Sequence, residues 1–508
     1  MARKRFYIIV VLFAVAFVLR YYDIYKDPFY FSSGDKDAFV DPGIYSFNAK
    51  HKITNGTFFF EEYNYHLVFP LNSFFTYLFF KIAGISFVSL IKFFACLGLI
   101  SSIIFSLAFK NETNFLYYAV LFSLTFIVIA VNRTGLTENY LLLWLALSLY
   151  CFKNETATHQ FVCGFLIVSG ILIKTNFVPA TVSIIAAGFF RRKENSVFRF
   201  FIFGIVSAVL ISLLYILKFY DSYALLKESV ILRHIFADHS GNFYFFNAFN
   251  VLTFLSSNFF IRCFMIYGFF LAGIYKIILN RNRNSKIEIL LIPVFILTVI
   301  AINLSATYSP ARYRLMLIPF FIIGSISYFT ISTEKKSAFL GTALSFFFVY
   351  PFAWWILKKK IQMNHSDCAV LIVSILLSVF LFYLLPKFSR FLNLKTFIVI
   401  FLAIELFQYF YSFHQTGYDL SNASKKINEL IPSGKTAAGW WAPQICFDRT
   451  DIKIIPGNLY KKYYEKYNPD YLIAANEQYK TNYELLDAFK LSRPNFLISI
   501  YKNKKLTE

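Results

Sequence analysis

The chain has 508 residues, of which 58% are hydrophobic and only 15% are charged. Soluble domains usually carry about 25% charged residues, so this composition excludes an ordinary soluble protein. The formal net charge of +22 could suggest a nucleic-acid partner. However, the Lys and Arg residues stand mainly in short clusters between apolar segments, which indicates orientation signals and contacts with anionic headgroups. We therefore expect membrane lipids as partners, and no nucleic acid.

Apolar segments long enough to cross about 30 Å of hydrocarbon recur from Phe6 to Phe413, and nothing comparable follows Tyr418. The pattern predicts an all-α polytopic membrane protein with about 13 transmembrane helices. Residues 14–16 could be the cleavage site of a signal peptide, but they lie inside the first apolar segment, which favours a retained first span. The expected spans are residues 6–20, 86–108, 115–131, 138–152, 159–173, 176–190, 197–217, 259–279, 287–303, 314–331, 338–357, 369–385 and 395–413.

The segment 67–84 decides on which side each later loop lies. It could cross the bilayer, or it could lie along the surface as a juxtamembrane hairpin, which leaves thirteen spans. Positively charged loops favour the cytoplasmic side. With residues 3–5 inside and 67–84 not crossing, only the triplet Lys358–Lys360 is a basic cluster on the outside, so we prefer thirteen spans. The basic clusters that then face the cytoplasm are residues 191–193, 281–286, 335–336 and 387–395.

Two domains follow from this topology. Residues 1–413 would form the transmembrane domain, with residues 21–85 as its first external loop, and residues 414–508 a small extracytoplasmic α/β domain. A second external loop would cover residues 218–258. The C-terminal domain shows no catalytic motif, so we expect a packing or acceptor-guiding role. Its predicted elements are a helix over 421–430 and strands near 452–455, 470–474 and 496–501.

The first external loop is acidic in an otherwise basic protein. Asp41 directly precedes Pro42, a residue that commonly opens a helix, so Asp41 would stand at a helix N-terminus. An acid there can be a simple cap worth about 1 kcal/mol, or it can face a substrate. Other acids of this loop include Asp35, Asp37, Glu61 and Glu62.

Several cations share the predicted outer face. Arg133 lies five residues before Glu138, which indicates either an ion pair at a helix end or a polar cavity. Lys174 stands between two spans, where it could simply reach the headgroups, and Arg312 precedes another span. Holding a phosphate at the outer headgroup level would explain these cations together, because Arg binds phosphate oxygens through two parallel hydrogen bonds.

These segments resemble the GT-C membrane glycosyltransferases, in the branch of the protein O-mannosyltransferases and the aminoarabinose transferase that modifies lipid A. The resemblance rests on the segments 41–49 and 65–71, on residues 133–138, and on Lys174 and Arg312. It covers nearly the whole chain, including the thirteen spans and the external C-terminal domain. Pro42 departs from the pattern, because the branch usually has a second acidic residue there.

The resemblance implies transfer of a sugar from a polyprenyl-phosphate donor to a hydroxyl of a lipid, glycan or protein acceptor, outside a bacterial cytoplasmic (inner) membrane. Asp41 would be the base that faces the acceptor. The residues that would contact the donor or its phosphate, or orient a group that does, are Arg133, Glu138 (orienting Arg133), Lys174, Arg312, Tyr45 and His66. Such chemistry needs a carboxylate at the acceptor and cations at the departing phosphate.

Two other readings stay open. An O-antigen ligase or polymerase would place its site in the loop 218–258, which contains Arg233-His234 and Asp238-His239. A flippase or transporter for polyprenyl-linked sugars would predict inverted repeats and broken helices, of which the sequence gives no clear sign. No cofactor is implied, and a divalent metal is undecided, because no spacing of acids is diagnostic and none of the six cysteines forms a CxxC pair. The sequence names neither the sugar nor the acceptor.

The orientation can be tested by placing single cysteines at Ser240 and Ser285 in a cysteine-free variant. The thirteen-span topology puts residue 240 outside and residue 285 inside. A membrane-impermeant thiol reagent added to intact cells should therefore label the first position only. Labelling at 285 but not at 240 would overturn this orientation of the later loops and separate Asp41 from the other candidate residues.

Overall fold

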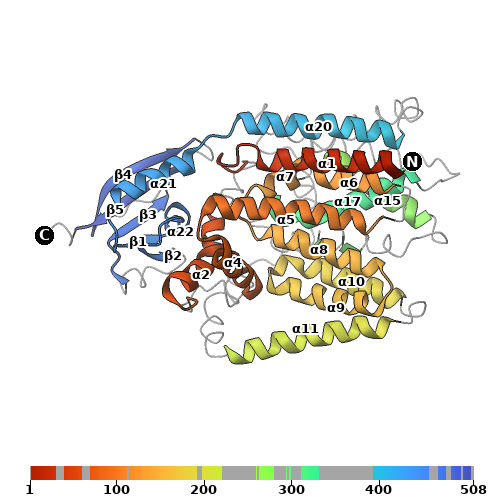
Figure 1. Ribbon diagram of the computed structural model, residues 1–508, viewed down its shortest axis with the longest axis horizontal. Helices are drawn as coiled ribbons and strands as arrows, with labels where there is room; N and C mark the ends of the chain where they lie inside the picture. Colours follow the sequence, from red (N-terminus) through yellow and green to blue (C-terminus); the bar gives the residue numbers. More distant parts are fainter. Residues whose placement is uncertain are drawn as a thin grey trace, which may run out of the picture.

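The computed structural model shows a mostly helical chain with a small sheet near its C-terminus (Figure 1). The apolar helices run side by side, with α1 and α20 at one edge of the bundle and α11 at the other. The sheet lies beyond one end of this bundle, next to α2 and α4. The structure describes residues 2–29, 39–59, 69–110, 114–191, 197–219, 259, 262–279, 293–294, 297–298, 311–330, 393–456, 467–475, 482–492 and 496–504.

Helices occupy the predicted spans wherever most of a span is described. They are α1 (Ala2–Tyr21), α5 (Phe87–Leu107), α6 (Phe115–Leu124), α7 (Phe126–Asn132), α8 (Glu138–Lys153), α9 (Ala157–Ser169), α10 (Val178–Arg191), α11 (Phe198–Lys218), α15 (Phe264–Leu279), α17 (Ile318–Thr330) and α20 (Leu394–His414). Short 3₁₀ turns join some of them: η2 (Gly170–Leu172), η3 (Thr175–Phe177) and η7 (Ala311–Leu317).

The chain is a membrane protein, and its most apolar helices show this directly. Three segments of the described residues are long and apolar enough to cross a bilayer, namely Phe87–Leu107, Phe198–Lys218 and Leu394–Leu430, and the bent pair α6–α7 would make a fourth. Only 17% of the apolar window of α11 is buried, as expected for a helix that faces lipid. The expected number of about 13 spans is not confirmed, and the predicted spans 338–357 and 369–385 lie outside the described residues.

The predicted span 115–131 is broken. Helices α6 and α7 meet at Thr125 with a bend of 56°, because the backbone of Thr125 is extended there. The first amide of α7, that of Phe126, donates to the buried carboxylate of Glu405 on α20 at 2.5 Å. An unsatisfied backbone group in a membrane costs several kcal/mol, so Glu405 stabilises the break.

The segment 67–84 folds into α4 (Pro70–Ala83), which packs against α2 (Asp41–Asn55). The 14 residues of α4 extend for about 21 Å, less than the roughly 30 Å of hydrocarbon. Phe74, Leu78 and Ile82 form an exposed apolar stripe on α4, whereas its polar residues Asn72 and Thr76 are buried. These features favour the surface hairpin over a crossing segment.

The C-terminal sheet has five strands in the order β2-β1-β3-β5-β4. Strand β1 pairs in parallel with β2 and β3, and β5 pairs antiparallel with β3 and β4. The predicted helix and the three predicted strands are confirmed as α21, β2, β3 and β5. Strands β1 and β4 were not predicted; the sequence TAAG of β1 lacks the β-branched residues that mark strands. The elements are α21 (Asp419–Leu430), β1 (Thr436–Gly439), α22 (Ala442–Ile445), β2 (Lys453–Pro456), β3 (Tyr471–Ala475), β4 (Tyr483–Leu491) and β5 (Phe496–Asn503).

The segment that follows α1 caps a helix of the C-terminal domain. Asp27, which follows α1, accepts the backbone N–H groups of Asp419 at 2.8 Å and Leu420 at 3.0 Å, the first two residues of α21. The residue that precedes α21, Tyr418, provides no side-chain cap, so a residue almost 400 positions away supplies it. The Tyr418 hydroxyl in turn donates to the Asp23 carboxylate. These contacts fix the C-terminal domain to the start of the first loop.

Asp27 makes this contact dependent on pH. Burial raises the pKa of Asp27 to about 6 from its ordinary value of 3.8, although the two accepted N–H groups favour the ionised form. A carboxyl with a higher pKa in the folded state contributes stability below about pH 4 and loses it as the pH rises through about 6. Relative to Asp27→Asn, the natural protein should therefore lose stability across this window, by at most about 3 kcal/mol. Melting temperatures of both proteins from about pH 4 to 8 check this, and parallel pH profiles would contradict it.

Candidate active site

Four charged side chains from distant parts of the chain meet at the end of the bundle near the C-terminal domain. Arg312 lies at the centre: its Nη2 is 2.6 Å from Asp41 Oδ2, and its Nε is 3.4 Å from Glu138 Oε1. Lys174 Nζ lies 2.6 Å from the same Oε1 of Glu138. The result is a continuous chain of ion pairs, Asp41–Arg312–Glu138–Lys174, which we call the charge cluster.

Each member of the charge cluster stands at the end of a structural element. Asp41 is the first residue of α2 and Pro42 is the second. A proline is well tolerated there, because an N–H group in the first turn of a helix has no partner within the helix. Glu138 is the first residue of α8, where a negative charge also interacts favourably with the helix dipole. Lys174 separates η2 from η3, and Arg312 lies in η7 before α17. Four elements therefore converge on one point.

All four side chains of the charge cluster are buried. The exposed fractions are 6% for Asp41, 2% for Glu138, 3% for Lys174 and 4% for Arg312. Two carboxylates and two cations cancel formally, which is how buried charges are tolerated in a low-dielectric interior. Removing one partner of a buried ion pair typically destabilises a protein by about 3–5 kcal/mol. The four elements that carry the cluster are therefore held together by interactions that the protein cannot lose singly.

Tyr45 belongs to the same site. It lies one turn after Asp41 on α2, and the Lys174 ammonium stands 4.9 Å from the centre of its ring. Its backbone carbonyl accepts a hydrogen bond from Asn72 of α4 at 3.1 Å. The hairpin of α2 and α4 thus brings an aromatic face to Lys174 and a carboxylate to Arg312. A cation over the face of an aromatic ring is attracted by the electrostatics of the ring.

Arg133 lies elsewhere. Its guanidinium donates to the backbone carbonyls of Leu19, Arg20, Tyr22 and Asp23 at 2.7–3.3 Å, at and just beyond the C-terminal end of α1. Glu138, which we expected to orient Arg133, instead pairs with Lys174 and Arg312. The reason is geometric: Arg133 ends α7 and Glu138 begins α8, and the turn between them directs the two side chains apart. Arg133 is a C-terminal cap for α1.

His66 lies outside the described residues, as do Asp35, Asp37, Glu61 and Glu62 and the loop residues Arg233-His234 and Asp238-His239. Within the described residues, no group of three or more His, Cys, Asp or Glu side chains could hold a metal ion. The carboxylates of the charge cluster are occupied by cations of the protein itself. The described part of the site therefore offers ion pairs and no ready metal ligands.

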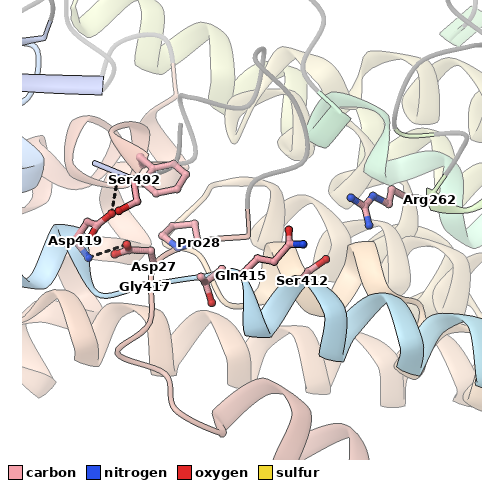
Figure 2. Close-up of a pocket in the computed structure, with 10 residues that line it drawn as sticks. Asp27, Pro28, Arg262, Ser412, Gln415, Gly417, Asp419 and Ser492 are labelled. Carbon is pink, nitrogen blue, oxygen red and sulfur yellow. Dashed lines mark hydrogen bonds between the residues drawn. The ribbon is translucent and has the colours of Figure 1, made fainter. Parts of the chain in front are cut away.

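A polar pocket lies near the charge cluster but is separate from it. Figure 2 shows Asp27, Asp419 and Ser492 together at one end and Arg262 at the other, with Gln415 and Ser412 of the α20 end between them. Phe39, two residues before Asp41, also lines the pocket. Its volume of about 30 Å³ holds one or two water molecules and no sugar ring. It belongs to the contact between the first loop and the C-terminal domain.

Neither a family model nor a curated protein matches this chain. Among solved structures, the fold is similar to that of ArnT from Cupriavidus metallidurans bound to undecaprenyl phosphate, with a TM-score of 0.53 and 12% identity over 97% of each chain. An oligosaccharyltransferase from Archaeoglobus fulgidus, in a complex with Zn and sulfate, matches with a TM-score of 0.46 and 12% identity, over 92% of this chain and 67% of that chain. The fold expected from the sequence resemblance is thus confirmed: along nearly its whole length, this chain is similar in fold to the GT-C glycosyltransferase ArnT.

Proposed function

We propose that the protein is a membrane glycosyltransferase that moves a sugar from a polyprenyl-phosphate donor to a hydroxyl of a lipid, glycan or protein acceptor on the external face of a bacterial inner membrane. The observation that carries the proposal is the charge cluster, in which a carboxylate at a helix N-terminus is joined to two buried cations in a chain with this fold. The binding of undecaprenyl phosphate by the structural neighbour supports the same donor class.

The roles follow from the charges. Arg312 and Lys174 would hold the phosphate of the donor, because a charge-assisted hydrogen bond to phosphate is about twice as strong as a neutral one. Arg312 is shared between Asp41 and Glu138. A phosphate that draws Arg312 toward itself would free the Asp41 carboxylate. Glu138 would keep both cations in place throughout, because it contacts each of them.

The reaction would then proceed by displacement at the anomeric carbon. The acceptor oxygen forms a bond to that carbon, the bond from the carbon to the phosphate oxygen breaks, and its electron pair stays on the lipid phosphate. The acceptor proton passes to Asp41. Arg312 and Lys174 neutralise the charge that develops on the departing phosphate, an effect that typically contributes a factor of about 10²–10³ per donor group. Tyr45 would face the donor from the side of α2.

Replacing Asp41 with Asn keeps the size of the side chain and removes the base. We expect transfer of radiolabelled sugar from a mixed pool of polyprenyl-phosphate sugars to cell-envelope acceptors to fall by about 10²–10⁴-fold, in membranes that contain equal amounts of protein. The matched control is Asp487→Asn, the same change at an acid of the C-terminal domain that pairs with Lys426. Undiminished transfer in Asp41→Asn would remove Asp41 from the mechanism, and an absence of transfer from every donor would favour transport.

Substitutions of Arg312 and Arg133 distinguish a catalytic role from a structural one. Arg312→Gln removes a phosphate contact and should lower the transfer rate of the folded protein by at least about 10²-fold. Arg133→Gln leaves carbonyls of the α1 end without donors, so it should lower the melting temperature while each folded molecule keeps its activity. Melting temperature and transfer rate, measured on the same purified samples, give the comparison. Equal losses of activity in the two variants would contradict the separation.

A further inference from the structure

The helix that carries Asp41 makes a close contact with the C-terminal domain. All residues of α2 from Asp41 to Lys50 are buried, and the short helix α22 packs against them. Gly43 permits the approach: a Cβ atom at this position would collide with the backbone of Pro443 and Gln444. In this contact, backbone lies against backbone, and a larger residue at position 43 would push the two helices apart.

The two helices cap each other at this contact. The first turn of α2 receives no side-chain cap from its own preceding residue, Val40. The buried side chain of Gln444 supplies one from α22, because its Oε1 accepts the Gly43 amide at 2.7 Å. In return, Lys50 of α2 donates to the carbonyls of Cys446 at 2.9 Å and Phe447 at 2.7 Å, at the C-terminal end of α22. Each helix end thus satisfies polar groups of the other that are otherwise unpaired.

We propose that Gln444 is a positioning residue for Asp41, so that the C-terminal domain sets the geometry of the active site from the outer side. The inference rests on the proposed function, because it concerns the same Asp41. Gly43 is only two residues from Asp41, and its amide is the next that α2 offers after that of Asp41, since Pro42 has no N–H. A hydrogen bond at this point fixes the position of the first turn of α2 along the helix axis and its rotation about that axis. The charge cluster holds the Asp41 carboxylate from the inner side, through Arg312.

Gln444→Leu removes the acceptor and leaves an apolar side chain, one atom shorter, that can remain buried. We expect a fall in kcat of about 10- to 100-fold, because a displacement of about 1 Å at a catalytic group can cost about 10²-fold. The donor KM should change by less than about threefold, since Arg312 and Lys174 are untouched. Gln444→Glu retains an acceptor oxygen at the same reach and should restore most of the rate. If Gln444→Leu does not yield folded protein, Gln444→Asn withdraws the same oxygen by one methylene.

The matched control is Asp448→Ala. Asp448 stands one turn beyond Gln444 and caps a different membrane helix, since its Oδ1 accepts the Phe87 amide at the start of α5 at 2.7 Å. Asp448→Ala removes a contact of the same kind between the same two parts of the protein and leaves the Gly43–Gln444 hydrogen bond in place, and it also removes a negative charge that attracts Lys50 of α2. Equal losses of kcat in Asp448→Ala and Gln444→Leu would overturn the inference, because docking of the domain in general would then be the cause.

Two further measurements distinguish positioning from a general loss of structure. In the Asp41→Asn background, Gln444→Leu should lower the residual rate no further, because it acts through Asp41; additive losses would overturn the inference. Hydrogen exchange of the peptide 41–50 should be faster in Gln444→Leu and unchanged in Asp448→Ala. This last measurement needs no transfer activity, so it tests the inference even if Asp41→Asn disproves the proposed function. Unchanged exchange in Gln444→Leu would refute it.

Discussion

Four charged side chains buried at the end of an apolar bundle constrain where the surrounding elements can lie. Asp41, Arg312, Glu138 and Lys174 come from positions up to 271 residues apart, and each is buried with a partner of opposite charge. In a low-dielectric interior, the separation of any pair would leave uncompensated charges. The starts of α2 and α8, the junction of η2 with η3, and η7 are therefore held in one arrangement. A donor phosphate would enter a site whose cations are already oriented.

Backbone groups at the helix ends also need partners when they are buried. Glu405 accepts the amide at the break between α6 and α7, and Arg133 donates to the carbonyls at the end of α1. Asp27 caps α21, and Gln444 caps α2. Each of these side chains comes from a distant part of the chain. Tertiary contacts, and not the local sequence, therefore provide the hydrogen-bond partners at these helix ends. A buried polar group without a hydrogen bond is costly in the protein interior as well as in the membrane, which explains why these helix ends are closed in this way.

The contacts between the bundle and the C-terminal domain bear on the proposed function. Asp27 attaches the first loop to α21, Asp448 attaches α5, and the reciprocal caps of Gln444 and Lys50 attach α2. The last of these contacts reaches to within two residues of Asp41. A domain without a catalytic motif of its own can therefore influence the reaction through the helix on which the carboxylate stands.

The sequence by itself determined the membrane class, most helix positions, three strands of the sheet and four residues of the charge cluster. Apolar length and alternation are local properties that can be read within a window of 10–20 residues. The sequence did not determine which charges pair. Arg133 and Glu138 are neighbours in sequence, yet Arg133 caps α1 and Glu138 joins Lys174 and Arg312. It also gave no sign of Gln444 or of β1, whose residues have no distinctive local pattern. Only the tertiary structure decided these points, because the partner of a buried polar group is the one that the packing brings within about 3 Å, whatever its distance along the chain.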